Sequence, residues 1–236
     1  MSSCTYSDHL QVIKGFCEKA DGKDKLTGLI QYVCMFLSAN EPGNIKKIQA
    51  SVTAARKVFR IMRPLESLTP LLISPGFNNK EPKMVQAVNK LKALLMATYF
   101  GADHFAWAYQ IGLIQDKQTG ETAGKVSLWS WGLGSVAGII AETIAISHMK
   151  VTPNEGESQS DYIKREAAIR GEINAKLFLI LHAVVQAAVA AGLLQLLPLK
   201  PRTTGLLGAI ASGMNCYLLL PKYPKLAVTA EKSKAQ

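Results

Sequence analysis

The chain has 236 residues, of which 48% are apolar and only 7% aromatic, and its formal net charge is +10. The four cysteines and four histidines are scattered without metal-ligand spacing, so neither a zinc site nor any other metal or cofactor site is expected. The cationic excess predicts an anionic partner, either nucleic acid or phospholipid headgroups.

Residues 1–87 contain no apolar run long enough to cross a membrane, and we expect them to form an amphipathic helical region in the cytosol. Apolar spacing predicts one short helix near residues 10–17. A second helix, capped by Asp21, is predicted by apolar residues that recur every three or four positions. These are Leu26, Leu29, Ile30, Val33 and Leu37.

The stretch 52–66, VTAARKVFRIMRPLE, separates basic from apolar side chains when it is drawn as one continuous helix. The candidate membrane-binding residues are Arg56, Lys57, Val58, Phe59, Arg60, Ile61, Met62 and Arg63. Glu66 alone falls on the wrong face and has no explanation. Four uses fit the pattern: an interfacial membrane helix, a calmodulin-type target, a nucleic-acid contact, or a helix docked on its own domain. Few aromatic residues interleave the cations, which argues against nucleic acid.

The long apolar runs that follow make a membrane the favoured partner of this helix. The regions expected after residue 87 are membrane-associated helices (88–149), a polar loop with a charged helix (150–176), a transmembrane hairpin (177–221) and a basic tail (222–236). Within them, four spans are predicted at about 91–114, 126–148, 177–198 and 204–221. The first contains Lys92, Asp103 and His104, so it could instead lie at the interface. The chain is therefore expected to be an all-α integral membrane protein.

Small residues recur at four-residue spacing in these runs and predict close helix packing, including packing between copies. They are Gly134, Gly138, Ala187, Ala191, Gly205, Ala209 and Gly213. Glu142 could line a polar path, but a place at the membrane edge or a pairing with a cation is favoured. Asp103 and His104 could form an acid/base pair, but a polar spot within a helix bundle is favoured. No catalytic motif occurs, so we do not expect an enzyme.

Three blocks in order carry a resemblance to a known family: GKDKLTGLIQYVCMFLS (22–38), ARKVFRIMRPLESL (55–68) and AAGLLQLLPLKPRTTGLLGAIASGMNCYLLLP (190–221). They resemble the peroxin-11 family of peroxisomal membrane proteins, most closely its plant-type members. The resemblance implies a multi-pass protein of the peroxisomal membrane, with both termini in the cytosol, that promotes peroxisome elongation, proliferation and fission.

The same resemblance implies a mechanism. An amphipathic helix, here 52–66, would insert into the cytosolic leaflet, copies would self-associate, and a fission adaptor and a dynamin-related GTPase would be recruited. Anionic lipids are the expected surface, and no nucleic acid is expected. The alternative function is a small-solute channel or transporter of the same membrane, with Glu142 or Asp103 on its pathway.

Overall fold

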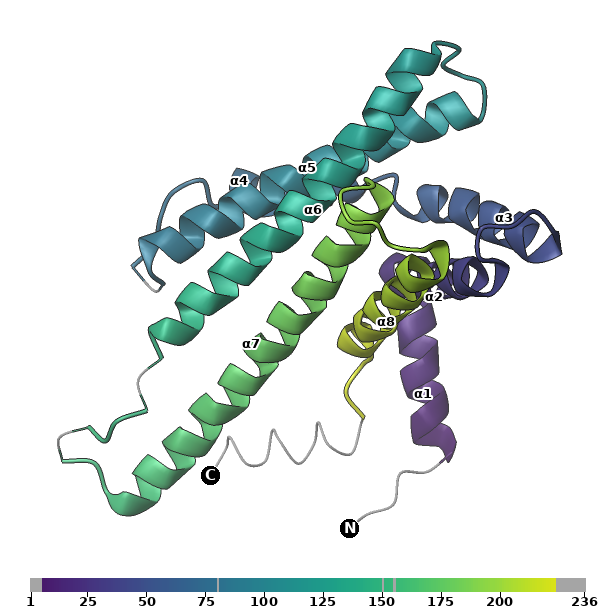
Figure 1. Cartoon of the computed structure of the whole chain (residues 1–236). Coiled ribbons are helices and arrows are strands. Elements are labelled where there is room, and N and C mark those ends of the chain that lie inside the picture. Colours follow the sequence, from purple (N-terminus) through teal and green to yellow (C-terminus); the bar gives the residue numbers. More distant parts are fainter. Residues whose placement is uncertain (1–5, 80, 150, 155, 224–236) are drawn as a thin grey trace. The chain divides into compact units, whose positions relative to one another are not determined.

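The computed structural model describes residues 6–79, 81–149, 151–154 and 156–223. These residues form eight α-helices and, within the same ranges, no strand (Figure 1), which confirms the all-α prediction. The chain divides into two compact units. One contains the residues up to Arg60 together with those from Lys200 onward, and the other contains Ile61–Leu199.

The first unit consists of α1 (Tyr6–Cys17), α2 (Ala20–Ser38), α3 (Asn44–Phe59) and α8 (Pro201–Leu219). Helix α2 is central because it packs against both α3 and α8. The prediction that Asp21 caps α2 is wrong: Lys19 is the N-cap residue, and Asp21 lies in the first turn. Helix α8 approaches α2 closely at Gly205, where a Cβ atom would lie 2.5 Å from the backbone nitrogen of Phe36. Only glycine allows this contact between two helix backbones.

The continuous helix predicted over residues 52–66 is interrupted. Helix α3 ends at Phe59, α4 (Arg63–Ile73) begins at Arg63, and the boundary between the two units follows Arg60. Pro64 explains the break, because it lacks an N–H group and could not donate to the carbonyl of Arg60 in a continuous helix. In the structure Pro64 lies in the first turn of α4, where a proline is tolerated.

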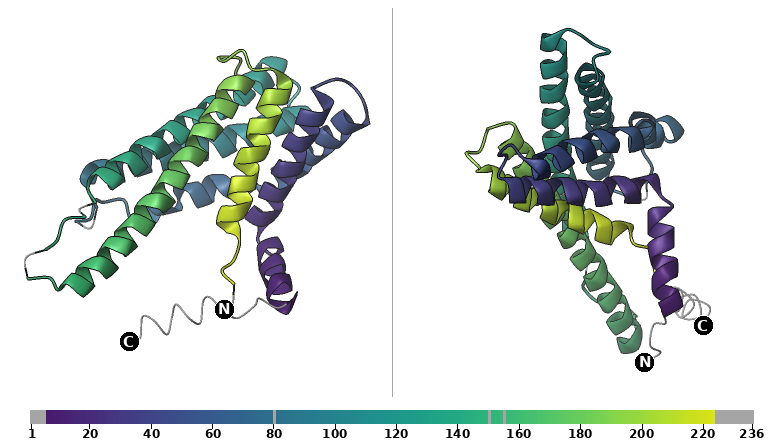
Figure 2. Two further views of the ribbon diagram at one scale, coloured as in Figure 1. Left: turned by 60° about the horizontal axis from the view of Figure 1, so that its bottom comes forward. Right: turned by 90° about the vertical axis from the view of Figure 1, so that its right-hand side faces the viewer.

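The second unit consists of α4, α5 (Lys83–Gln110), α6 (Lys117–Ser147) and α7 (Gln159–Leu193). Helix α6 runs back along α5 and also packs against α7, while α4 packs against α5 (Figures 1 and 2). The start of α6 is fixed by Asp116, whose carboxylate accepts hydrogen bonds from the backbone N–H groups of Gln118 and Thr119. Three long helices thus lie side by side in this unit.

Two of the described helices, α6 and α7, are long and apolar enough to cross a membrane. Among the described residues, α5 and α8 do not meet the same requirement, although both are helical where spans were predicted. The charged helix expected before residue 177 and the span expected after it are one continuous helix, α7 (Gln159–Leu193). The two helices of the expected C-terminal hairpin belong to different units, α7 with α6 and α8 with α2. Most of the predicted basic tail, from residue 224, lies outside the described residues.

Candidate functional site

The stretch 52–66 has apolar side chains on the outside and basic side chains on the inside. Val58, Ile61 and Met62 are 52%, 52% and 58% exposed. Arg56 and Arg60, by contrast, are only 9% and 5% exposed, and Lys57 is also buried. This is the reverse of the usual arrangement in a water-soluble helix, whose charged face meets the solvent.

The buried arginines converge on one carboxylate of α2. The Nε atoms of Arg56 and Arg60 donate to the same oxygen, Oδ1 of Asp24, over 3.0 and 2.7 Å. The other oxygen, Oδ2, accepts from Nζ of Lys25 over 3.2 Å. Nη1 of Arg56 also donates to Oε1 of Gln31 over 2.6 Å. Helices α2 and α3 are therefore joined by a compact network of charge-assisted hydrogen bonds.

The charges of this network keep the central carboxylate ionised. Burial by itself would raise the pKa of Asp24, but the positive charges of Arg60, Lys25 and Arg56 outweigh it and hold that pKa well below its usual range. Burial lowers the pKa of Lys25, and the attraction of Asp24 opposes that shift only in part. Asp24 itself is 1% exposed, so these cations are its counter-charges in place of water.

Asp24 was not predicted as a functional residue, although the spacing of polar and small residues in α2 indicates it. Asp24, Gly28 and Gln31 are spaced i, i+4, i+7 and therefore lie on one face of α2. Gly28 leaves room for the guanidinium of Arg56, because a Cβ atom at position 28 would lie 2.9 Å from its Cζ. A polar and small stripe of this kind indicates a helix face that receives charged side chains from a neighbour.

Glu66, which had no explanation on the helical wheel, pairs with a cation of its own helix. On α4, Nη1 of Arg63 lies 3.1 Å from Oε2 of Glu66. The guanidinium of Arg63 also lies 5.8 Å from the centre of the Phe100 ring on α5. Arg63 is thereby held within the second unit. The membrane-binding role assigned to residues 56–63 stays a prediction, and its cations are placed inward.

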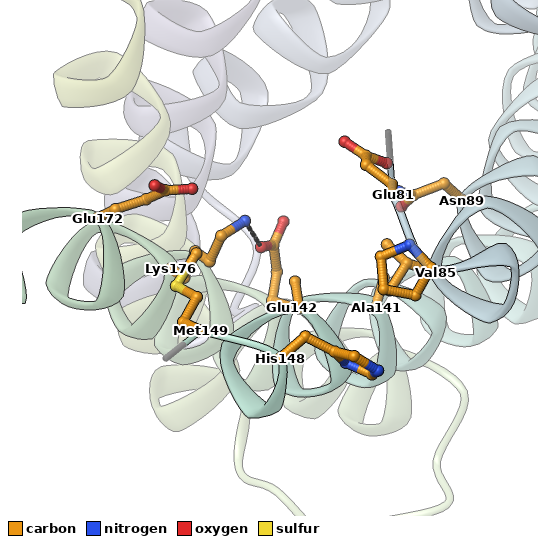
Figure 3. Close-up of a pocket in the computed structure, with 11 residues that line it drawn as sticks. Glu81, Val85, Asn89, Ala141, Glu142, His148, Met149, Glu172 and Lys176 are labelled. Carbon is orange, nitrogen blue, oxygen red and sulfur yellow. Dashed lines mark hydrogen bonds and ion pairs between the residues drawn. The ribbon is translucent and has the colours of Figure 1, made fainter. Parts of the chain in front are cut away.

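In the second unit, Glu142 of α6 pairs with Lys176 of α7, with 3.0 Å between Oε2 and Nζ. This confirms the expectation that Glu142 pairs with a cation. The pair lies on the wall of a cavity of about 360 Å³, with Glu172 on one side and Glu81 and Asn89 on the other (Figure 3).

Asp103, the other carboxylate considered for a pathway, is buried on α5. Its neighbour His104 has a buried Nε2 atom without a hydrogen-bond partner in the described part of the chain. Asp103 and His104 are neighbours on α5, about 100° apart around the helix, and the acid/base pair stays a prediction.

Three of the predicted packing residues face other helices of the same chain. Gly134 and Gly138 face α5, where a Cβ atom would lie 3.2 Å from Sδ of Met96 and 3.2 Å from Nζ of Lys92 respectively. Gly205 faces α2. The other four are partly exposed: Ala187, Ala191, Ala209 and Gly213. A Cβ atom at Gly213 would meet nothing within 4 Å. Packing between copies stays a prediction for these residues.

Comparison with known proteins gives a consistent result. Residues 10–220 match the family model of peroxisomal biogenesis factor 11 (PEX11). Peroxisomal membrane protein 11C of Arabidopsis thaliana is 31% identical over 223 residues, which cover 92% of this chain and 94% of the relative. Peroxisomal membrane protein 11D of the same plant is 32% identical with the same coverage, and peroxisomal membrane protein PMP27 of Saccharomyces cerevisiae is 24% identical over 63% of this chain. No solved structure matches the chain. The chain therefore belongs to the family of peroxisomal biogenesis factor 11.

Proposed function

We propose that this protein resides in the peroxisomal membrane, where it elongates peroxisomes and promotes their proliferation and fission. Membership of the family supports this function, and the relatives are named peroxisomal membrane proteins. The observation that carries the mechanism is the orientation of α3: Ile48 and Val58 are exposed, whereas Arg56 and the C-cap residue Arg60 are buried. Such a helix can enter one leaflet while it stays attached to the rest of its unit.

The outward face of α3 provides the driving force for insertion. Ile45, Ile48 and Val58 are 40%, 51% and 52% exposed. Transfer of a fully exposed Ile or Val side chain out of water is worth about 1.5–3 kcal/mol, so half-exposed side chains contribute roughly 1 kcal/mol each. A helix inserted into one leaflet only expands that leaflet and favours positive curvature. No catalytic residue is needed for this action.

The arginines have a different role in this proposal from the one expected on the helical wheel. Arg56 and Arg60 hold α3 on α2 through Asp24, whereas headgroup contacts fall to the exposed cation Lys47 near the start of α3. Membrane binding should then depend mainly on apolar burial and only weakly on salt, because screening acts on exposed charges. Anionic lipids remain the proposed surface, since one exposed cation is worth about 1 kcal/mol there.

The test uses the full-length protein reconstituted into vesicles that contain anionic lipid, with tubulation scored by electron microscopy. Substitution of Ile48 and Val58 by Gln should abolish tubulation and leave the helical content unchanged. The matched control is Ile163→Gln, an equally exposed isoleucine (54%) in the polar half of α7. Tubulation that persists in the α3 variant, or that is lost equally in the control, contradicts the wedge mechanism. In cells, the α3 variant should fail to increase the number of peroxisomes.

Self-association and recruitment of a fission adaptor and a dynamin-related GTPase complete the proposal. The partly exposed small residues of α7 and α8 are suited to contacts between copies in a membrane. Gly213→Cys, placed in a variant whose native cysteines are replaced, should form a cross-linked dimer in the membrane. The control is Lys125→Cys in the same variant, at a position near the start of α6 and away from its apolar part. Its cross-linked yield measures non-specific collisions. Equal yields at both positions would contradict a specific contact at α8.

A small-solute channel is the less favoured function. The carboxylate of Glu142 is already neutralised by Lys176, which removes the reason to place it on a conduction path. Planar-bilayer conductance of the purified protein that disappears in Glu142→Gln would restore the channel as the better explanation.

A further inference from the structure

Lys92 of α5 is a partly exposed cation that has no ion-pair partner among the described residues. Its Nζ lies 3.2 Å from the position of a Cβ atom at Gly138, and no ion pair or hydrogen bond to it is found within the described ranges. Leu91 and Leu94 beside it are about half exposed. A charged side chain among apolar residues is costly unless an opposite charge or water meets it.

A cavity lies beside Lys92, between α5, α6 and α7. It has a volume of about 150 Å³, and its polar wall includes Ser135, His182 and Gln186. Glu142 also lines it, but the charge of its carboxylate is neutralised by Lys176. The amide of Gln186 is fixed, because Oε1 accepts from Nε1 of Trp131 over 3.1 Å and Nε2 lies 2.8 Å from Nε2 of His182. This volume exceeds that needed for a water molecule several times over. A small anionic group would fit here and meet the ammonium of Lys92.

The neighbouring cavity of about 360 Å³ has the opposite charge. Glu81, Glu142 and Glu172 line it, and Lys176 neutralises only Glu142 (Figure 3). Neither Glu81 nor Glu172 has an ion-pair partner among the described residues. This cavity therefore favours a cationic group that can donate hydrogen bonds to carboxylates.

The two cavities meet at Glu142, which lines both. Glu142 follows Gly138 by one helical turn, about 6 Å along α6, and is paired with Lys176. The cavity beside Lys92 is lined by residues from the apolar half of α7. The acidic cavity is lined by Glu172 and Lys176 from the charged half of α7. A phospholipid headgroup has the same order, with its phosphate deeper and its amine nearer to water.

We propose that the second unit binds the headgroup of a phospholipid with a primary amine, phosphatidylethanolamine. Its phosphate meets Lys92, its ammonium meets Glu172, and its acyl chains lie along the exposed leucines of α5. A choline headgroup lacks N–H donors, and a glycerol headgroup lacks the positive charge, so both should bind less well. This site is separate from the wedge on α3 and does not depend on it.

The experiment is native mass spectrometry of the full-length protein in detergent, incubated separately with phosphatidylethanolamine, phosphatidylcholine and phosphatidylglycerol. We expect one phosphatidylethanolamine per chain in clear excess over the other two lipids. Lys92→Ala should lower its affinity about tenfold, the loss expected for one charge-assisted hydrogen bond. Glu172→Gln should lower the binding of phosphatidylethanolamine but not of phosphatidylglycerol. The matched control Lys83→Ala removes an exposed cation from the same end of α5 and should change nothing.

Further arms keep the proposal open to refutation. Gly138→Leu fills the cavity without changing its charge and should also reduce binding, with helical content checked by circular dichroism. Equal binding of the three lipids, or unchanged binding in both Lys92→Ala and Gly138→Leu, would overturn the site. Soluble glycerophosphoethanolamine, which has the head without the chains, should not displace the lipid at equal concentration. Full displacement would overturn the assignment to a membrane lipid.

Discussion

The carboxylate of Asp24 is the residue on which the attachment of α3 depends, and Asp24→Asn tests this directly. The substitution keeps the shape of the side chain and removes its charge. Arg56 and Arg60 would then stay 9% and 5% exposed with no negative partner at Oδ1. Removal of one partner from a buried ion pair costs about 3–5 kcal/mol. Two arginines share this oxygen, so we expect a value toward the upper end of that range.

Hydrogen–deuterium exchange of the α3 amides measures this cost as local opening. A loss of about 3–5 kcal/mol should speed the exchange of α3 by two to four orders of magnitude. The control is Glu18→Gln, which removes an exposed pair with Lys14 at 3.7 Å and should cost under about 1 kcal/mol. If α3 in Asp24→Asn exchanges less than about tenfold faster, or no faster than in the control, then Asp24 does not hold α3 on α2.

The pH dependence of the opening free energy of α3 provides a second test of the role of Asp24. The pKa of Asp24 in the folded chain is below that of the unfolded chain, so its contribution to stability is complete above the usual carboxyl range of about 3.9. It is lost only as the pH falls through the lower, folded-state pKa. The opening free energy of α3, corrected for intrinsic exchange, should therefore be constant between about pH 5 and 8. A fall within that window would show that Asp24 is not ionised against the arginines.

Two further predictions concern packing and the polar loop. Gly205→Leu should destabilise the α2–α8 pair by about 1–3 kcal/mol in thermal unfolding, because its side chain would meet the backbone of Phe36. Gly213→Ala, on the open side of α8, should instead be neutral or stabilising by up to about 1 kcal/mol; equal losses in the two variants would contradict the described contact. The hydrogen bond from Arg165 lowers the pKa of Glu157 from 4.5 to about 2, so this pair should order its loop above about pH 4.5 and release it as the pH falls toward 2. Nuclear magnetic resonance titration of the Glu157 carboxyl measures this, and a midpoint near 4.5 would refute it.

The helices of this chain are largely predictable from sequence, because apolar spacing and length are local properties. The helical character of all four predicted spans follows from these two properties. The break after Phe59 could also have been predicted, since Pro64 cannot continue a helix that includes Arg60. The helical wheel missed it because a wheel assumes one continuous helix.

The inward orientation of the arginines could not be predicted from the sequence in the same way. The partner of Arg56 lies 32 positions away in the sequence, and the partner of Arg60 lies 36 positions away. An amphipathic pattern tells which residues share a face, but not whether that face meets lipid, water or a buried carboxylate. In the same manner, Gly205 was recognised as a packing residue, whereas its neighbour α2 is set by contacts between distant parts of the chain.

Helix α7 has a mechanical consequence that follows from its unbroken length. Its 35 residues extend about 52 Å at 1.5 Å per residue, whereas the hydrocarbon core is about 30 Å thick. If α7 crosses the membrane along its normal, about 20 Å of helix at its charged end projects beyond the hydrocarbon. Because α7 is one unbroken helix, a force applied to its projecting end is transmitted to the part inside the bilayer. A protein that binds the projecting end would therefore tilt or rotate α7 in the membrane. The length of α7 also sets the distance between the membrane surface and that binding position, so α7 would act as both a lever and a spacer.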